Sequence, residues 1–512
     1  MENPIPVIDI FAGPGGLGEG FSAAKSKNNH NLFQIKISIE KDLHAHKTLE
    51  LRAFFRQFTE KKVPVEYYEY LQGSITREEL FSKYKIEAEL AKNEACLATL
   101  GETPENWVDN KIKNALGETS NWVLIGGPPC QAYSLVGRSR MRGENEEKYE
   151  KDPRHFLYKE YLRIIAIHKP PIFVMENVKG LLSSQINQQK TFDLILSDLR
   201  NPPKAVGDDS QQKLSYVLFS VSKKRPNDIG KVNHEDFIVR SEEYGIPQAR
   251  HRLIILGIRA DFYNSDPEIL QKQTPAFIED VLNDLPKLRS GVSKEEDSVS
   301  LWYKIIQEIK FANWANSLPE QLREKMNTIF VNIDTNLSRG KTFIPTTSKP
   351  KRHKDWYGDP NLNGVCNHET RSHIREDLYR YFFAALFASE NGYSPKLSDF
   401  PDELLPKHGN IQDALTGSKF NDRFRVQVQR RPSTTVVSHI SKDGHYYIHY
   451  DPAQCRSLTV REAARLQTFP DNYLFEGPRT EQYHQVGNAV PPMLAHQIAQ
   501  IVAKLFENQK SN

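Results

Sequence analysis

The sequence predicts an α/β protein in which helices cover both faces of a mostly parallel sheet, with a smaller second domain. Short apolar runs alternate with helical patterns through the first 262 residues, which is typical of a doubly wound sheet. A glycine-rich turn directly follows the first run, where such folds bind nucleotide-like ligands. The long segment 263–455 breaks this alternation and is rich in Pro, Asn, Ser and charge, which indicates a separate region.

Each strand is predicted from an apolar run that turn residues bound. The runs are 7–11, 33–40, 67–72, 122–125, 172–175, 216–221 and 252–258. We expect helices after the first two runs and at about 158–168, and a polar helical insertion at 76–120. Beyond 262, helical patterns recur at 301–311 and 374–389, residues 333–365 predict a loop, and order returns at 457–469 and in a last helix at 493–506.

Composition indicates an intracellular enzyme, which we place in the cytoplasm. The four cysteines of the 512 residues are far apart and lack CxxC spacing, so we expect neither disulfides nor a zinc knuckle. No apolar run is long enough to span a membrane, and the N-terminus lacks the basic and apolar regions of a signal peptide. The net charge of +3 does not by itself indicate nucleic-acid binding, so local basic clusters such as 349–354 and 429–431 are the candidates.

Residues 126–134, Gly-Gly-Pro-Pro-Cys-Gln-Ala-Tyr-Ser, place Cys130 where a predicted strand gives way to a loop. Two prolines before the cysteine restrict the backbone and hold it extended. A lone cysteine is more often an inert, buried apolar residue. This rigid setting nevertheless favours a nucleophile that is aimed at a pocket.

The turn Gly13-Pro-Gly15-Gly-Leu-Gly18 follows the first strand and opens the first helix. It satisfies the G-x-G-x-x-G pattern that binds phosphate or nucleotide groups at a helix N-terminus. Glu40 ends the second strand 22 residues later, where a carboxylate accepts hydrogen bonds from ribose hydroxyls. This layout suits a dinucleotide or S-adenosylmethionine (AdoMet), and a purely structural turn is the alternative.

Three further charged residues lie at predicted strand ends. Glu176 closes the run 172–175, at the edge where open α/β sheets bind ligands, although a helix-capping acid would also fit. Arg250 and Arg252 lie two apart before an apolar strand and therefore point to the same side of an extended segment. Because two guanidinium groups repel each other, we expect them to share an anionic partner.

In order along the chain, these motifs resemble those of the DNA (cytosine-5) methyltransferase family of the bacterial restriction-modification type. The matching segments are Asp9-Ile-Phe11-Ala-Gly13-Pro-Gly15-Gly-Leu17, Glu40-x-Asp42, Gly127-Pro-Pro-Cys130-Gln131, Glu176-Asn-Val178, Gln248-x-Arg250-x-Arg252, Arg461-Glu-Ala-Ala-Arg-Leu-Gln467-Thr-Phe-Pro470 and Gln485-Val-Gly487-Asn-Ala-Val-Pro-Pro492. The resemblance leaves most of 263–455 unmatched. It implies the Rossmann-like fold of AdoMet-dependent methyltransferases with a smaller target-recognition domain.

The resemblance also implies the catalytic residues. Cys130 would be the nucleophile that adds to C6 of cytosine, and Glu176 would hold or protonate N3 of the base. Arg252 would contact the exocyclic oxygen, and Arg250 would order the site.

AdoMet is the cofactor that the resemblance implies. The residues that would bind it are Phe11, Gly13, Gly15, Gly16, Leu17, Glu40, Ser74, Ile75, Pro128, Asn488, Ala489 and Val490. Two positions depart from the family pattern. Gly73-Ser74-Ile75 stands where the family has Asp-Ile after its third strand, and Lys41 replaces a bulky apolar residue.

The implied partner is double-stranded DNA, from which the target base is flipped into the pocket. We assign residues 1–262 and 478–512 to the catalytic domain and 263–477, including the junction 456–477, to target recognition. The residues expected at DNA are Gln131, Ser134, Arg138, Arg140, Gln248, Gln427, Gln429 and Arg430. We expect a monomer, with a restriction endonuclease as a functional partner rather than a physical one.

Three other functions compete with this interpretation. An oxidoreductase that uses NAD or FAD would explain the glycine-rich turn but neither Pro-Pro-Cys nor Gln-x-Arg-x-Arg. A nucleic-acid-binding relative without catalysis would not need Cys130. A tRNA cytosine-5 methyltransferase of the same lineage is the nearest alternative. We expect no metal site, because the histidines of His368-Glu-Thr-Arg-Ser-His373 are five apart and point away from each other on a helix. That segment is expected to be exposed.

Overall fold

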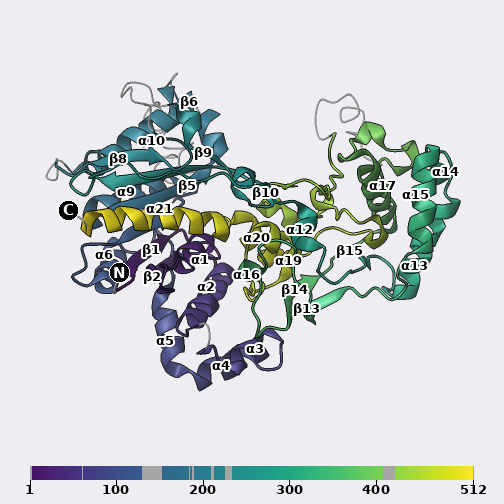
Figure 1. The fold of residues 1–512 in the computed structure, drawn as a ribbon, viewed down its shortest axis with the longest axis horizontal. Helices are drawn as coiled ribbons and strands as arrows, with labels where there is room; N and C mark the ends of the chain where they lie inside the picture. Colours follow the sequence, from purple (N-terminus) through teal and green to yellow (C-terminus); the bar gives the residue numbers. More distant parts are fainter. Residues whose placement is uncertain are drawn as a thin grey trace.

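The computed structural model describes residues 3–59, 62–129, 153–183, 185–186, 189–208, 213–224, 233–406 and 421–510. Its centre is an eight-stranded sheet (Figure 1). In spatial order the strands are β3 (Ala95–Leu97), β2 (Phe33–Glu40), β1 (Ile5–Ile10), β4 (Val123–Gly126), β5 (Ile172–Val178), β11 (His251–Arg259) and β8 (Tyr216–Ser220), with β9 (Ile238–Arg240) also on β11. The first five run parallel, and β11 is antiparallel to its neighbours. The predicted, mostly parallel sheet is confirmed.

Helices cover both faces of the sheet because alternate strand residues are apolar on each face. One face packs against α1 (Gly16–Ser22) and α21 (Pro492–Lys510), and the other against α6 (Glu105–Leu116), α9 (Pro153–His168) and α10 (Thr191–Arg200). On β4, for example, Val123 and Ile125 belong to the first core and Leu124 to the second. Short elements complete this lobe: β6 (Gln185–Ile186), β7 (Gln189–Lys190) and α11 (Pro202–Val206).

The strand predicted at 67–72 is wrong. These residues form helix α3 (Val65–Leu71), which begins after Pro64. Tyr67, Tyr68 and Leu71 are buried against α2 (Leu43–Arg56), α4 (Arg77–Lys83) and α5 (Lys85–Glu94), at a spacing that suits one helical face. The true third strand, β3, lies inside the stretch that we took for a helical insertion, where its three residues were too short a signal.

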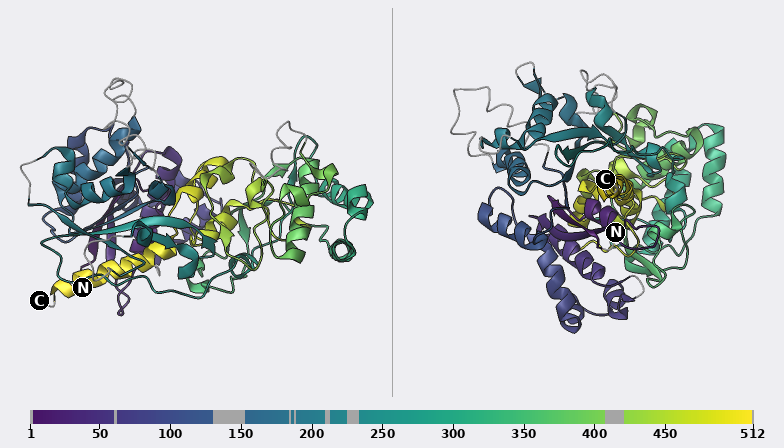
Figure 2. Two further views of the ribbon diagram at one scale, coloured as in Figure 1. Left: turned by 90° about the horizontal axis from the view of Figure 1, so that it is seen from above. Right: turned by 60° about the vertical axis from the view of Figure 1, so that its left-hand side comes forward.

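The second lobe is mostly helical and packs around its own apolar core. Its helices are α13 (Val299–Glu308), α14 (Asn313–Asn316), α15 (Glu320–Val331) and α17 (Arg375–Asn391), which confirms the helices expected at 301–311 and 374–389. Segment 333–365 is less irregular than predicted, because β13 (Gly340–Pro345) pairs with β14 (Gly364–Glu369) and α16 (Lys354–Tyr357) lies between them. The two lobes lie along the long axis of the molecule (Figure 2).

The chain crosses between the lobes several times. β10 (Gln248–Ala249) pairs in parallel with β16 (Ser433–Thr434), and β12 (Gly291–Val292) pairs with β15 (Ser372–His373). Helices α12 (Ile278–Leu282), α19 (Val460–Leu466) and α20 (Arg479–Asn488) occupy the middle of the molecule (Figure 1). Within the described part of the chain, no helix combines the length and the apolar character that a membrane span requires.

Candidate active site

A cavity of about 520 Å³ lies at the carboxyl edge of the sheet. Its wall comes from the residues that follow β1, β2, β3 and β4, from the end of β5, and from α20. Parallel strands present their carboxyl ends at one edge, which is where open α/β sheets bind ligands. Of the twelve residues predicted to bind the cofactor, nine line this cavity: Phe11, Gly13, Gly16, Leu17, Glu40, Pro128, Asn488, Ala489 and Val490.

The glycine-rich turn is shaped by conformations and contacts that only glycine accommodates. Gly13 and Gly15 have φ of +56° and +92°, in the region that disfavours residues with a Cβ. Gly15 does not line the cavity but caps the start of α1. A Cβ on Gly16 would lie 2.2 Å from the carbonyl oxygen of Val490. The turn therefore rests directly against the wall that follows α20.

Glu40 is held at the end of β2 by two backbone amides. The N–H groups of Gly13 and Asp42 each donate to its carboxylate at 2.8 Å. Burial raises the pKa of Glu40 despite these hydrogen bonds. The carboxylate thus ties the glycine-rich turn to β2 while lining the cavity, in the position expected for a ribose-binding acid.

The residues predicted to line the cavity after the third strand, Ser74 and Ile75, are wrong. Ser74 and Ile75 follow helix α3, where the Ser74 amide donates to Glu69 O and Ile75 packs against the α2–α5 core. Neither lines the cavity. Ala98, Thr99 and Leu100, which directly follow β3, lie in that wall instead, and Lys41 lines it beside them. The misplaced strand caused this error.

The Pro-Pro loop approaches the end of β5 closely. Asn177 donates from Nδ2 to the carbonyl oxygen of Pro128 at 2.9 Å and accepts the Val178 amide at 2.8 Å. A Cβ on Gly127 would lie 2.8 Å from the Glu176 carbonyl oxygen, so only glycine permits this approach. The loop that leads to Cys130 is therefore fixed against β5. Cys130, Gln131, Ser134, Arg138 and Arg140 lie outside the described residues.

Glu176 and Arg252 form an ion pair at the edge of the cavity. Arg252 Nε lies 3.0 Å from Glu176 Oε1, and both side chains are largely buried. β5 and β11 are antiparallel, with Arg252 opposite Val178, so their side chains meet at the end of the strand pair. A carboxylate and a guanidinium held in this way present a matched acceptor and donor set to a planar polar ring.

Arg250 does not pair with Glu176, so the two arginines do not share an anionic partner as predicted. It is buried and donates from Nη1 to the carbonyl oxygens of Val436 at 2.9 Å and Gly487 at 3.3 Å. Burial and the charge of neighbouring Arg252 lower the pKa of Arg250 to about 9. Its contacts are with backbone rather than with the cavity, so it acts on the site through other residues.

Comparisons with known proteins agree with this geometry. A model of the C-5 cytosine-specific DNA methylase family matches residues 98–202 and 231–504, more than half of the chain. Type II methyltransferase M.Bpa9945I of Bacillus paralicheniformis is 33% identical over 97% of this chain and 98% of its own length. The chain belongs to this family.

Two more distant relatives also match most of the chain. Type II methyltransferase M.DdeI of Desulfomicrobium norvegicum is 24% identical over 98% of this chain and 89% of its own length. DNA (cytosine-5-)-methyltransferase M.ApeKI of Aeropyrum pernix is 27% identical over 75% of this chain and 81% of its own length. The protein is accordingly a cytosine-5 DNA methyltransferase with the AdoMet-dependent methyltransferase fold, and AdoMet is its cofactor.

The cavity of this cytosine-5 methyltransferase fits AdoMet. Gly13, Gly16 and Leu17 of the glycine-rich turn line one wall, and Glu40 beside them offers an acceptor for ribose hydroxyls. Sequence reasoning missed three wall residues of α20: Glu481, His484 and Gln485. Their helical spacing of three, four and seven from Asn488 was the available signal, because such residues share a face.

Two of the predicted DNA contacts are buried in the methyltransferase. Gln248 donates from Nε2 to Leu466 O and to Gln467 Oε1, both at 3.1 Å, and accepts the Val436 amide at 2.8 Å. Gln427 donates to Tyr446 O and accepts the Thr434 amide at 3.0 Å. All polar atoms of both side chains serve internal hydrogen bonds, so neither reaches a base edge. Gln429 and Arg430 remain exposed.

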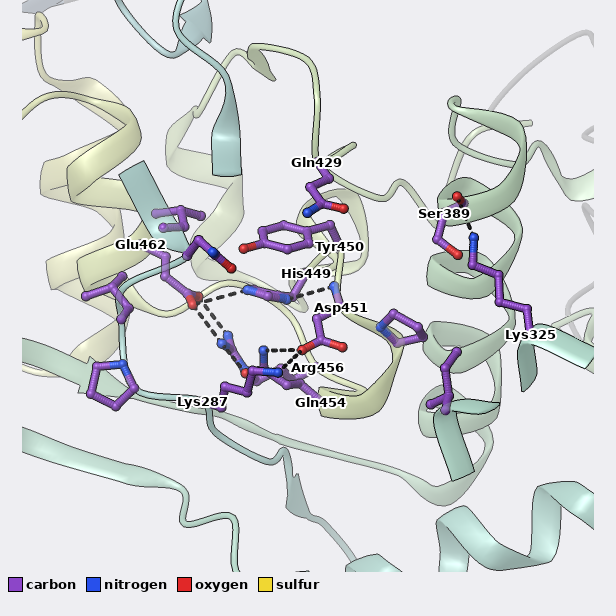
Figure 3. Close-up of a pocket in the computed structure, with 16 residues that line it drawn as sticks. Lys287, Lys325, Ser389, Gln429, His449, Tyr450, Asp451, Gln454, Arg456 and Glu462 are labelled. Atoms are coloured by element: carbon purple, nitrogen blue, oxygen red, sulfur yellow. Dashed lines mark hydrogen bonds and ion pairs between the residues drawn. The ribbon is translucent and has the colours of Figure 1, made fainter. Parts of the chain in front are cut away.

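A second cavity, of about 300 Å³, lies beside Gln429 (Figure 3). Arg456 and Glu462 pair on its inner wall at 2.7 Å, both 1% exposed. His449 Nδ1 accepts the Asp451 amide, and burial together with the Arg456 charge lowers its pKa to about 4, so it is neutral near pH 7. The charged groups of the inner wall are thus already paired with each other, as expected for residues with a structural role rather than for a ligand site.

The histidines of 368–373 are buried, not exposed as predicted. His368 hydrogen-bonds Thr459 Oγ1 and Pro286 O through its two ring nitrogens, and His373 hydrogen-bonds Ser457 Oγ. The segment is extended in β14 and β15 rather than helical. Among the described residues, no group of three or more His, Cys, Asp or Glu side chains is arranged to hold a metal ion.

Proposed function

We propose that the protein methylates C5 of one cytosine within a specific duplex sequence, with Cys130 as nucleophile and Glu176 and Arg252 as the base-binding pair. The observation that supports this most directly is the Glu176–Arg252 ion pair, 3.0 Å apart beside the cofactor cavity and the Pro-Pro loop that leads to Cys130. The Pro-Pro loop, the base-binding groups and the cofactor wall thus converge on one edge of the sheet.

Each side chain has a defined chemical task in this proposal. The Cys130 thiolate forms a bond to C6, and the displaced ring electrons make C5 nucleophilic. Glu176 stabilises the charge that develops at N3, and Arg252 binds the exocyclic oxygen. Bound AdoMet supplies the methyl group, which C5 takes from the sulfonium. Solvent water then takes the C5 proton, and the electrons of the C5–H bond re-form the C5–C6 double bond, which expels the thiolate and restores the aromatic ring.

The basic segment 421–443 is the proposed duplex-binding surface. It carries five Lys or Arg side chains and two Asp, a net charge of +3 that equals that of the whole chain. Arg430, Arg431 and Lys442 are exposed, and Arg430 Nε lies 3.6 Å from Glu279 with its side chain 83% exposed. Clustered, exposed cations attract the phosphate backbone, and Gln429 and Arg430 are residue types that read purine edges.

The cluster 349–354 is a weaker candidate for DNA contact. Arg352 donates to the carbonyl oxygens of Pro275 and Thr274, and His353 Nε2 bonds Gly245 O at 3.1 Å. These groups fasten the segment to neighbouring loops. We assign 263–477, including the junction 456–477, to target recognition, and 1–262 with 478–512 to catalysis.

We also propose that the protein acts on host DNA in the cytoplasm as a monomer, alongside a separate restriction endonuclease. The support is that the relatives M.Bpa9945I and M.DdeI are named type II methyltransferases. Expression in a host without cytosine methylation, followed by deamination sequencing, would map the methylated site. The same protein incubated with tRNA tests the alternative substrate, and methylation of tRNA but not duplex DNA would contradict the proposal.

Covalent trapping tests Cys130 directly. Duplex DNA with 5-fluorocytosine at the mapped position lacks the C5 proton that must leave, so wild-type protein should form an adduct that survives denaturation. Cys130→Ala should form none and should abolish methyl transfer while AdoMet binding persists. Substantial methylation by pure Cys130→Ala protein would rule out the mechanism.

A further inference from the structure

Three buried polar side chains join the basic segment to the cofactor wall. Gln248 and Arg250 come from the catalytic lobe, at β10 and directly before β11, and Gln467 follows α19. Gln248 and Gln467 are fully buried, and Arg250 is 2% exposed. None of the three lines the cofactor cavity. Their hydrogen bonds therefore reveal what they hold in place.

On one side, Gln248 and Arg250 hold a single residue of the basic segment. Gln248 Oε1 accepts the Val436 amide at 2.8 Å, and Arg250 Nη1 donates to the Val436 carbonyl at 2.9 Å. Thr435 adds a third tie by donating to Ala249 O at 2.7 Å. Both backbone polar groups of Val436 are thus fixed by side chains of the catalytic lobe, six residues after Arg430.

On the other side, the same group holds the end of α20. Gln467 Nε2 donates to Val486 O at 2.7 Å and Ala489 O at 3.3 Å, while Arg250 reaches Gly487 O. These carbonyls surround Asn488, Ala489 and Val490, which line the cofactor cavity. Gln248 completes the chain by donating to Gln467 Oε1 at 3.1 Å.

Backbone contact reinforces these hydrogen bonds. A Cβ on Gly487 would lie 2.3 Å from the amide nitrogen of Ser438, so the end of α20 rests directly against the basic segment. A Cβ on Gly16 would meet Val490 O equally closely. Packed interiors of this kind transmit displacements instead of absorbing them. A shift of 436–438 would therefore move the cofactor wall and the glycine-rich turn.

From this geometry we infer that Gln467 and Arg250 are positioning residues that make cofactor binding and duplex binding depend on each other. When exposed residues of the basic segment bind DNA, they fix the position of Val436. Because Gln248, Arg250 and Gln467 connect Val436 to residues 486–490, the position of the cofactor wall then follows that of Val436. The inference rests on the proposed duplex-binding surface. By thermodynamic linkage, the cofactor changes duplex affinity by the same factor as the duplex changes cofactor affinity.

The test measures the dissociation constant for S-adenosylhomocysteine, which binds without turnover, with and without a duplex carrying the mapped site. In wild type we expect the duplex to tighten binding by a factor in the range of roughly 5–150. Gln467→Glu replaces the donor to Val486 O and Ala489 O with an acceptor, and should bring this ratio to within about twofold of unity. A merely structural role would weaken binding equally with and without duplex and leave the ratio unchanged.

Gln482→Glu is the matched control, because Gln482 also lies on α20 and donates from Nε2 to a carbonyl, that of Gly477, at 2.8 Å. It should keep the wild-type ratio. If Gln467→Glu does not fold, Arg250→Lys retains the charge but can serve only one of the two carbonyls well, and should give an intermediate ratio. The inference would be overturned if the ratio in wild type were near one. It would also be overturned if Gln467→Glu and Arg250→Lys both kept the ratio of wild type. Neither result would count against the proposed methylation. Failure of wild type to bind S-adenosylhomocysteine would instead count against the proposed function.

Discussion

The carboxyl edge of the sheet and the basic segment 421–443 differ in how the sequence specifies side-chain positions. At the sheet edge, Glu40 and Glu176 come from parallel strands of one sheet, and hydrogen-bonded register brings them to one cavity. In 421–443 only two residues form a strand. Gln427 and Gln429 lie two apart, yet one is buried and the other is exposed. Regular backbone makes side-chain direction predictable, whereas irregular backbone leaves it to tertiary contacts.

The largest expected effect is at the sheet edge. Glu176→Gln keeps the size of the side chain but removes the charge that stabilises N3 protonation, so the turnover rate at saturating AdoMet and DNA should fall by ~10²–10⁴-fold. Duplex binding should persist. Glu40→Ala should instead raise the AdoMet concentration needed for half-maximal rate. The roles would be reversed if Glu176→Gln were near wild type and Glu40→Ala crippled turnover at saturating AdoMet.

The same difference between regular and irregular backbone explains which residues of the sheet edge could be predicted from the sequence. The glycine-rich turn, Glu40, the Pro-Pro loop and Glu176 were located correctly because each directly follows or ends a strand with a clear apolar pattern. Ser74 and Ile75 were misplaced because three-residue β3 gave no such pattern, and the tyrosines of α3 resembled a strand. A short strand at the edge of a sheet is stabilised by its pairing with the neighbouring strand, here β2, so its own residues carry little signal.

The recognition residues were less predictable for a different physical reason. Gln248 and Gln427 have the side chains of base readers, but the same amides satisfy buried backbone groups of Leu466, Val436, Tyr446 and Thr434. Those partners are between 7 and 218 residues away in sequence. Such long-range pairing depends on the complete fold, and one sequence does not reveal it.

Arg430→Ala tests the exposed side of the segment. Loss of a base contact should weaken specific duplex binding by about 1–3 kcal/mol and relax the choice of base at one position. Methylation mapping by deamination sequencing, together with duplex affinities at several salt concentrations, would measure both. Lys442→Ala should instead weaken all duplexes alike and reduce the salt dependence. An unchanged site preference in Arg430→Ala would place sequence choice elsewhere.

Gln427→Leu and Gln429→Leu form a matched pair with opposite expected readouts. Gln427→Leu leaves the buried Thr434 amide and Tyr446 carbonyl without their partner, which should lower the free energy of unfolding by about 1–3 kcal/mol. The site preference of folded protein should stay the same. Gln429→Leu, at an exposed position, should alter duplex binding more than stability in denaturant unfolding. The reverse pattern would mean that Gln427 turns outward to reach DNA.

A pH-dependent effect is expected at Asp9, which lies one residue before the end of β1 and is completely buried. Burial raises the pKa of Asp9 to about 8, whereas in the unfolded chain the pKa is roughly 3.9. Between these values the unfolded state releases the Asp9 proton and the folded state retains it. Stability therefore falls as pH rises, by up to about 1.4 kcal/mol per pH unit. Asp9→Asn is neutral in both states, so its free energy of unfolding relative to wild type should increase steadily from pH 5 to pH 7 in urea titrations. Parallel pH profiles for the two proteins would contradict this prediction, because they would show that the pKa of Asp9 is not raised in the folded protein.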